Sequence, residues 1–250
     1  MLVIKIQSFY KRIATFFRLF PIRLTRLWQH LFRGFTFQVS KKEYWKDEAD
    51  TASWVSVFFV WLFEILVLFL ELLGVGEIYE TLCDFFKYNT RPLTTNEIIL
   101  AKTIYGNSID YTPVRIDEKA HAGPRFYRFC YVSFNIINSW GRMHDNIFIH
   151  ELVHIWQYQR YGAIYMVRAL MAQHTDCGYD YGGVTALKLR RKKGEGFVDF
   201  NLEQQGDIIS DYFLLMNGYE TQWGYAGMED LPIYQSFVDE LNIPHKGLQA

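Results

Sequence analysis

Two histidines four positions apart mark the part of the sequence where residue types and spacing allow catalysis. His150 and His154 enclose the string His-Glu-Leu-Val-His. On a helix, residues four apart lie on one face, so both imidazoles can bind one Zn²⁺ ion at about 2.0–2.1 Å. Glu151 then faces the open side of the metal, where its carboxylate can take a proton from the water on the zinc and pass it to a leaving amine. This is the chemistry of a zinc-dependent metallopeptidase, which hydrolyses peptide bonds in a peptide or protein substrate.

A third metal ligand has to come from another part of the chain. Glu203 is followed four residues later by Asp207, which resembles the arrangement in the thermolysin-like zincins, or gluzincins. That resemblance implies Glu203 as the third ligand and Asp207 as the carboxylate that orients a ligand histidine by a hydrogen bond. Asp211, one helical turn further along, is a second candidate for this orienting role. His121, His144 and His174 stay open as alternative ligands, with His174 the first of these because it follows the next predicted helix and precedes Asp176. Glu203 and Asp207 could instead simply cap and solubilise a helix.

Helices have to position these residues. The apolar pattern predicts a helix over 145–160 that begins at Asp145 or Asn146 as its cap, and a second helix over 201–216. The polar, glycine-rich and basic stretch 176–196 between them is predicted to be a loop. The remaining predictions are a capped helix from Thr94 to Tyr105, a strand at 111–116, one or two strands at 126–138, and helices at 163–173 and 231–241. The fold class is therefore α+β, with a zincin-like domain over residues 90–250 that combines a small sheet with the His-Glu-Leu-Val-His helix.

The N-terminal segment is strongly basic. Residues 1–46 contain ten Lys and Arg but only one acid, Glu43, although the whole chain has a formal net charge of -1. That overall charge gives no indication of nucleic acid as a partner. Residues 1–37 alternate basic and large apolar side chains, a pattern typical of a helix that lies at a membrane interface. Pro21 is expected to kink or split this helix.

A second N-terminal segment, residues 54–75, is apolar and about as long as a bilayer-spanning helix. Its two acids, Glu64 and Glu71, share a helical face, which should meet a partner helix, a second copy or the lipid headgroups. Residues 1–80 therefore form a helical membrane-associated module, with lipid contacts through residues 1–75. If the apolar helix spans a bacterial inner membrane, the basic residues place the N-terminus in the cytoplasm and the metal site on the other side. A helix lying in the membrane plane leaves that site in the cytoplasm, and a core helix of a soluble domain is the third interpretation.

Parts of the second half resemble a known family: small bacterial zincin-like putative metallopeptidases described as Vgr-related or Rhs-associated. These are akin to the peptidase-like domain of contractile injection systems and polymorphic toxins. The similar stretches are residues 92–98, 104–111, 149–159 and 200–212. The resemblance implies zinc as the cofactor, a partner in a secretion or toxin system, and a site made of the ligands His150, His154 and Glu203 with Glu151 as the base. Tyr179 and Tyr181 lie in a similar tyrosine-containing loop, and either is a candidate donor to an oxyanion.

Two other functions fit the same residues. The first is a non-catalytic, zinc-stabilised adaptor that docks other proteins at a membrane. The second is a membrane-active toxin whose N-terminal helices act on the bilayer, while the zincin domain serves to release the toxin. The three cysteines, Cys83, Cys130 and Cys177, provide no paired metal motif and do not identify the compartment.

Overall fold

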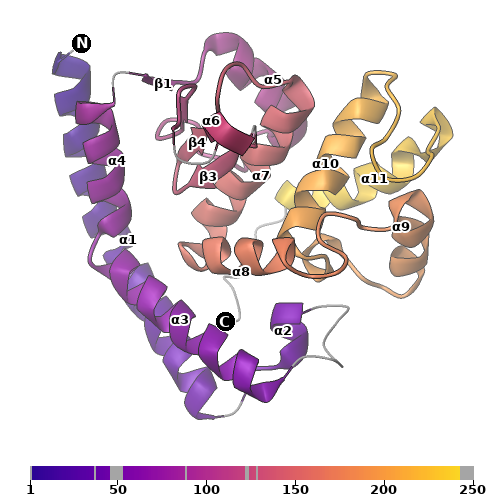
Figure 1. Ribbon diagram of the computed structural model, residues 1–250, viewed down its shortest axis with the longest axis horizontal. Helices are drawn as coiled ribbons and strands as arrows, with labels where there is room; N and C mark the ends of the chain where they lie inside the picture. Colours follow the sequence, from indigo (N-terminus) through magenta and orange to yellow (C-terminus); the bar gives the residue numbers. More distant parts are fainter. Residues whose placement is uncertain are drawn as a thin grey trace.

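Helices make up most of the protein, and four short strands form a small sheet beside them (Figure 1). The computed structural model describes residues 2–36, 38–45, 53–87, 89–121, 124–127 and 129–242. The α-helices are α1 (Leu2–Phe35), α2 (Lys41–Trp45), α3 (Trp54–Leu72), α4 (Val75–Phe86), α5 (Thr95–Tyr105), α6 (Pro124–Tyr127), α7 (Asp145–Tyr161), α8 (Ile164–Gln173), α9 (Gly183–Lys192), α10 (Leu202–Met216) and α11 (Leu231–Val238). The strands are β1 (Thr90–Pro92), β2 (Arg115–Asp117), β3 (Tyr131–Ser133) and β4 (Ile136–Asn138), and the 3-10 helices are η2 (Phe197–Asp199), η3 (Met228–Asp230) and η4 (Asp239–Asn242). The predicted α+β class is confirmed, with helices predominating.

The sheet has the strand order β1-β2-β4-β3, so β1 and β3 are its edges. Strands β2 and β4 are parallel, whereas the two outer pairs are antiparallel. The strand expected at 111–116 begins only at Arg115, because the Asp110 carboxylate accepts a hydrogen bond from the Thr112 amide and holds the preceding residues in a turn. The region 126–138 does contain two strands, β3 and β4, but its first residues belong to α6.

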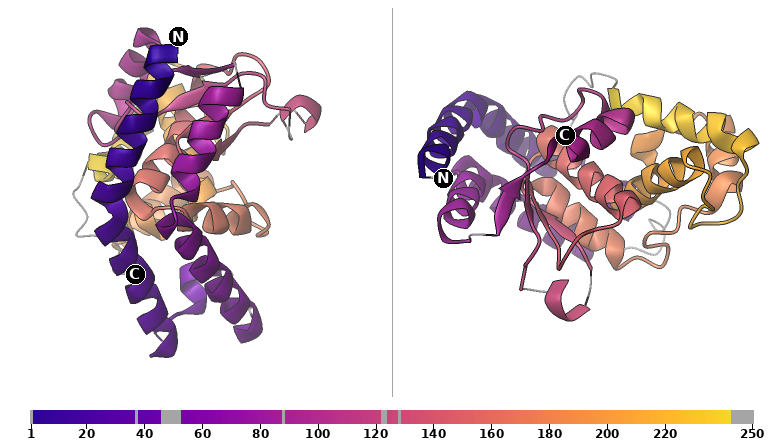
Figure 2. Two further views of the ribbon diagram at one scale, coloured as in Figure 1. Left: turned by 90° about the vertical axis from the view of Figure 1, so that its left-hand side faces the viewer. Right: turned by 90° about the horizontal axis from the view of Figure 1, so that it is seen from above.

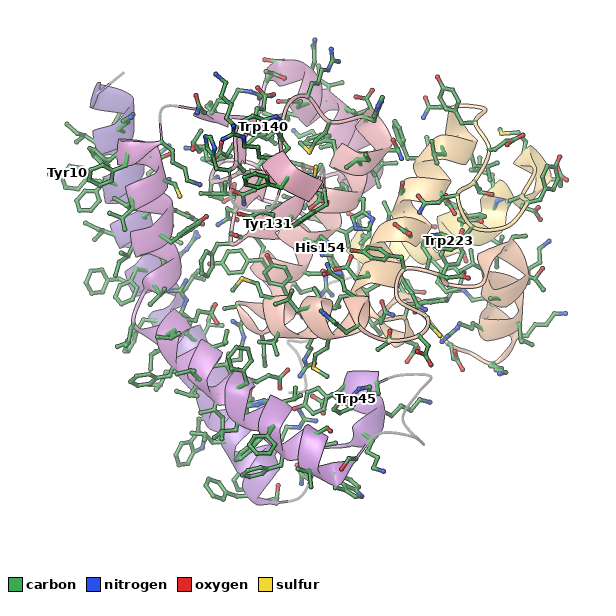
Figure 3. All side chains as sticks on the ribbon, in the orientation of Figure 1. Tyr10, Trp45, Tyr131, Trp140, His154 and Trp223 are labelled. Atoms are coloured by element: carbon green, nitrogen blue, oxygen red, sulfur yellow. The ribbon has the colours of Figure 1, made fainter. Side chains whose placement is uncertain are left out.

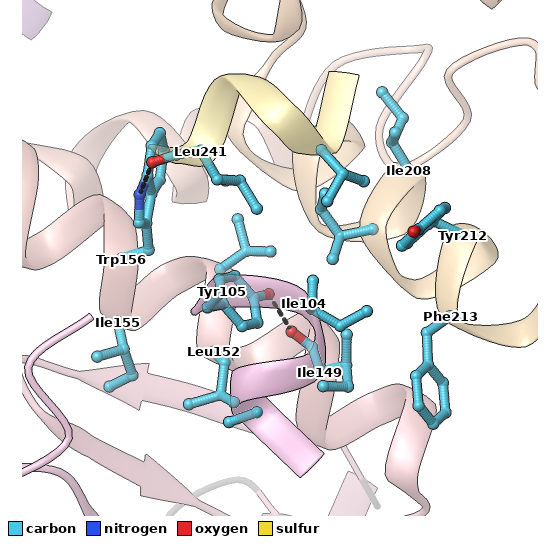
Figure 4. Close-up of a cluster of buried hydrophobic side chains, with 14 of the residues drawn as sticks. Ile104, Tyr105, Ile149, Leu152, Ile155, Trp156, Ile208, Tyr212, Phe213 and Leu241 are labelled. Carbon is cyan, nitrogen blue, oxygen red and sulfur yellow. Dashed lines mark hydrogen bonds between the residues drawn. The ribbon is translucent and has the colours of Figure 1, made fainter. Parts of the chain in front are cut away.

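The main core lies where α5, α7 and α10 meet the C-terminal helices (Figure 4). Helix α5 starts as predicted, since the Thr94 hydroxyl accepts from the Glu97 amide and the Glu97 carboxylate accepts from the Thr94 amide. At its other end the buried Tyr105 hydroxyl donates to the Ile149 carbonyl of α7 over 2.6 Å. The Trp156 indole donates to the Leu241 carbonyl over 3.2 Å. These bonds between buried partners fix α7 inside the core.

Two further predicted boundaries were wrong. The stretch 176–196 is not a continuous loop, because Gly183–Lys192 forms α9. Val184 and Leu187 are buried in the main core and α9 packs against α11, so tertiary packing outweighs the flanking glycines and the exposed basic residues. Helix α7 begins after His144 as its N-cap rather than at a capping Asp145 or Asn146, and no side chain caps it.

The N-terminal helices form a long layer along one side of the molecule. Helix α1 runs beside α4 and then α3, and the remaining elements lie behind these helices in the left view of Figure 2. Pro21 does not split α1, which continues unbroken to Phe35. Among the described residues, α3 is the one helix long and apolar enough to cross a membrane. Met1 and Phe37, at the ends of the predicted basic segment, lie outside the described residues.

Both acids of α3 face the interior. Glu64 is completely buried and accepts from the Arg168 guanidinium of α8 over 2.7 Å and from the Tyr44 hydroxyl over 2.8 Å. Glu71 is buried against Arg26 and Arg23 of α1. The face of α3 with Glu64 and Glu71 was expected to meet a partner helix, a second copy or the lipid headgroups. In the structure it meets partner helices of the same chain, α1 and α8.

Candidate metal site

Helices α7 and α10 pack against each other and bring three predicted ligands together. His150 and His154 lie one turn apart on α7, and Glu203 lies in the first turn of α10. The potential ligand atoms of these residues all lie within 4.8 Å of one another. The Nε2 atoms of His150 and His154 are each 3.4 Å from Oε2 of Glu203. Figure 3 shows His154 at the junction of α7, α8 and α10.

These separations fit a metal better than direct hydrogen bonds. Charge-assisted N–H···O bonds span about 2.7–2.9 Å, which is shorter than the 3.4 Å observed. Ligand atoms about 2.0–2.2 Å from a tetrahedral Zn²⁺ stand roughly 3.3–3.6 Å apart, which agrees with both distances. The donor set, two imidazoles and one carboxylate, is one that zinc accepts in catalytic sites.

The other nitrogen of each imidazole is held by a neighbouring side chain. Nδ1 of His150 lies 2.8 Å from Oδ1 of Asp207, and Nδ1 of His154 lies 2.8 Å from Oε1 of Gln157. Protons on both Nδ1 atoms would leave the Nε2 lone pairs directed at the common position near Glu203. Burial lowers the pKa of both imidazoles, but the nearby carboxylates outweigh it and the pKa of each is raised.

A glycine of α10 allows the two helices to approach closely at the site. A Cβ atom added to Gly206 would lie 2.4 Å from Cε1 of His150 and 2.7 Å from both ring nitrogens. Real Cβ contacts essentially never fall below 3.0 Å. Gly206 therefore leaves the space in which the His150 ring lies.

Glu151 has a buried carboxylate oxygen, Oε2, without a hydrogen-bond partner among the described residues. Leaving a buried acceptor without a partner costs about 1–3 kcal/mol or more for a charged group, so such an atom requires an explanation. Burial raises the pKa of the Glu151 carboxyl, although the two histidines act in the opposite direction. A general base that receives a proton from a bound water has these properties.

Glutamines support the site in ways that the sequence analysis missed. The Gln173 amide of α8 donates to Oε1 of Glu203 over 2.8 Å, which leaves Oε2 facing the histidines. Gln157 donates to the Leu202 carbonyl and to Gln205, so it connects α7 with the start of α10. The helical spacing of Gln157, three residues after His154, was the available sequence signal.

Asp207 and Asp211 have different positions. Asp207 contacts the ligand His150 directly and also accepts from the Trp223 indole over 2.5 Å. Asp211 contacts neither ligand histidine. It accepts from the Trp223 amide over 3.1 Å and from the Tyr181 hydroxyl over 2.5 Å. Asp211 thus holds the segment that supplies Trp223 and acts on the site only through it.

Of the two tyrosine candidates, Tyr179 lies beside a candidate metal ligand, whereas Tyr181 contacts Asp211 instead. The Tyr179 ring lies 6.1 Å from the His150 ring, and its side chain is partly exposed. Burial and the carboxylates of the site, led by Glu203, raise the pKa of Tyr179, so its hydroxyl stays protonated. Tyr181 is buried against Asp211 and Tyr234, away from the ligands.

The alternative ligand His174 is not brought to the metal site. It ends α8, is exposed, and its Nδ1 lies 2.7 Å from the Leu170 carbonyl. The only group of potential metal ligands found in the described part of the chain consists of His150, His154 and Glu203. Of the candidates for a third ligand, Glu203 lies beside the two histidines and His174 does not.

Comparison with known proteins finds a similarity over part of the chain. The chain is similar to the type VI secretion system spike protein VgrG2b of Pseudomonas aeruginosa, with 31% identity over 142 residues. The match covers 52% of this chain but only 13% of the spike protein, so it concerns a small part of that much longer protein. No family model matches the chain. No solved structure matches it either.

Proposed function

We propose that this protein is a zinc-dependent metallopeptidase of the gluzincin type. The observation that supports it most is the convergence of His150, His154 and Glu203 beside a buried Glu151 oxygen that lacks a partner. A purely structural cluster would have no use for that unsatisfied oxygen, because its burial lowers stability. The three converging residues would hold the metal, and Asp207 and Gln157 would orient the imidazoles.

In the proposed mechanism the protein residues position a water molecule and move one proton. Zinc bound by His150, His154 and Glu203 would supply Lewis acidity toward the water and the substrate carbonyl. Glu151 accepts the proton that the water loses on attacking the carbonyl carbon, and then gives it to the nitrogen of the leaving amine. The Tyr179 ring lies 6.1 Å from the His150 ring and its side chain is partly exposed, so its neutral hydroxyl is the candidate donor to the oxyanion that develops on the carbonyl oxygen.

The similarity to a spike protein supports a role in bacterial secretion. The relative is a spike protein of the type VI secretion system, and the matching region is a small fraction of its length. We propose that the present protein is a secretion-linked enzyme that shares this region. The substrate would then be a peptide or protein that the secretion system or its target cell supplies.

The decisive experiment compares zinc content and cleavage in the same protein samples. The full chain, purified in detergent, should contain about one zinc and should cleave members of a broad peptide library. Glu151→Gln should retain the zinc and lose cleavage by a factor of about 10²–10⁴, because it removes the general base but not a ligand. Glu220→Gln, on the exposed surface, is the matched control and should behave as the parent.

Two results would contradict the proposal. Cleavage by Glu151→Gln at the parent rate would show that this carboxylate is not the base. A chain that binds zinc tightly but cleaves no peptide would instead indicate the non-catalytic adaptor. Zinc analysis of Glu203→Ala and His174→Ala tests the ligand set, since only the first should lose the metal.

A further inference from the structure

The layer formed by α1, α3 and α4 is apolar on its outside. Most of the exposed large hydrophobic side chains of the described residues lie on these three helices. Phe17 and Trp28 of α1 are each 69% exposed, Phe59 and Phe63 of α3 are 62% and 50% exposed, and Phe86 of α4 is 74% exposed. Tyr10, which Figure 3 labels, points away from the rest of the molecule. Monomeric soluble proteins rarely expose a continuous apolar surface of this extent.

Several charged residues of the same helices are buried and paired on the inner side of the layer. Arg12 of α1 is buried and pairs with Glu80 at 3.2 Å and Asp84 at 2.5 Å, both on α4. Arg23 is buried as well and pairs with Glu77 of α4 at 2.6 Å. A water-soluble layer would place these ion pairs outside and the aromatic side chains inside. The observed arrangement is that of helices whose outer surroundings are apolar.

Charge on the outer face favours lipid over another protein copy. Lys11 and Arg18 of α1 are exposed, and no acid of α1, α3 or α4 is exposed in the described part of the chain. A basic, aromatic surface suits anionic headgroups, beneath which Trp28 and Trp54 can lie at the interface. A second copy would bring the same positive charges against this face.

The ion pairs behind α3 show how the layer would meet the bilayer. Glu64, at the middle of α3, is held by Arg168 of α8, and α8 in turn packs against α7 and α10. If α3 crossed the bilayer, α8 would have to enter the hydrocarbon or Glu64 would lose its partner there. Either change leaves a charge in an apolar medium, which is costly. With α3 in the plane of the membrane, its outer face contacts lipid while Glu64 keeps its partners.

We propose that α1, α3 and α4 form a monotopic attachment surface that lies in the plane of an anionic bilayer, with the metal site on the same aqueous side as the rest of the chain. This surface does not depend on zinc or on catalysis, so its test is independent of the proposed peptidase function.

The first test measures binding of the full chain to vesicles by flotation. Vesicles of phosphatidylglycerol and phosphatidylethanolamine should float the protein, and pure phosphatidylcholine vesicles should bind it more weakly. The double variant Phe59→Asp/Phe63→Asp should weaken binding at least tenfold. Ile99→Asp is the matched control, because Ile99 is 60% exposed on α5, outside the layer, and this variant should bind as the parent does. Equal binding by parent and double variant would overturn the proposal.

The second test distinguishes a helix in the membrane plane from a spanning one. Phe63→Trp places an indole at the middle of α3, and its added fluorescence is measured in vesicles with bromine near the headgroups or near the bilayer centre. Stronger quenching by the shallow bromines supports the planar arrangement. Stronger quenching by the deep bromines would establish a spanning helix and refute it. A third result would show that the layer joins two copies instead. In that case the parent does not bind vesicles and is a dimer in solution, whereas the Phe59→Asp/Phe63→Asp variant is a monomer.

Discussion

The contact between Gly206 and His150 predicts a large effect of adding one methyl group. In Gly206→Ala the new Cβ would lie 2.4 Å from Cε1 of His150, whereas ordinary contacts begin at 3.4 Å. The imidazole therefore has to move by about 1 Å, which is roughly five times the tolerance of about 0.2 Å for a metal ligand. We expect zinc affinity to fall more than 100-fold, or about 2.8 kcal/mol, since this change removes a ligand rather than an orienting partner.

Stability should change much less than zinc affinity. Alanine favours a helix interior by about 1 kcal/mol over glycine, and overpacking costs about 1–3 kcal/mol. Metal-free Gly206→Ala should therefore be destabilised by at most about 2 kcal/mol. Denaturant unfolding of the metal-free chain measures this change in the free energy of unfolding. Competition with a chromophoric chelator measures the zinc affinity.

Gly76→Ala provides the control. Gly76 lies on α4, where an added Cβ would approach Phe134 to 3.0 Å and the Tyr158 hydroxyl to 3.1 Å. This variant is also crowded by aromatic side chains, but it should bind zinc like the parent. Parental zinc affinity in Gly206→Ala would refute the reasoning, because it would mean that His150 does not bind metal from its position against α10.

Three further predictions concern the site and the N-terminal layer. Asp207→Asn should weaken zinc binding about 10–100-fold, measured by chelator competition, because it removes the charged partner of His150 Nδ1. Chelation of zinc should lower the Tm measured by calorimetry by about 5–10 °C, since a metal at 100 times its Kd adds about 2.7 kcal/mol. Burial lowers the pKa of His30, with Arg168 acting in the same direction and Glu64 opposing. The unfolded chain therefore takes up a proton near pH 6.5 before the folded chain does, so the free energy of unfolding should decrease as the pH falls through about 6.5. In His30→Gln the free energy of unfolding, measured by denaturant titration, should depend less on pH between about 5 and 7. An unchanged pH dependence would show that His30 is not the cause.

Local rules were sufficient to locate half of the candidate site. His150, Glu151 and His154 follow from helical spacing, and the capped starts of α5 and α10 follow from their side chains. The position of Glu203 beside the histidines depends on how α10 packs against α7, across a segment that sequence patterns could not place. For that reason the sequence alone does not decide between Glu203 and His174 as the third candidate ligand.

The N-terminal segment illustrates a different limit. The basic and aromatic pattern predicts a helix at a membrane interface, but composition does not show where each charge points. Arg12, Arg23 and Arg26 instead meet acids of α3 and α4 that lie many residues later in the chain. Pairing between distant charges is set by tertiary contacts, so the sequence could indicate a basic helix but not the inward direction of its arginines.

Helix α8 has a consequence for how this protein could be shortened. From the middle of α8 Arg168 binds Glu64 of the N-terminal layer, and five residues later Gln173, at the C-terminal end, donates to Glu203. Ile164, also on α8, is buried against Leu27 and Leu68 of that layer. A fragment that begins at residue 90 would expose Ile164 to water. It would also remove the contacts that hold α8, the helix whose Gln173 positions Glu203. The half that contains the candidate site is thus expected to need the N-terminal helices in order to fold, so a gene fusion that transfers this site to another protein would have to include both halves.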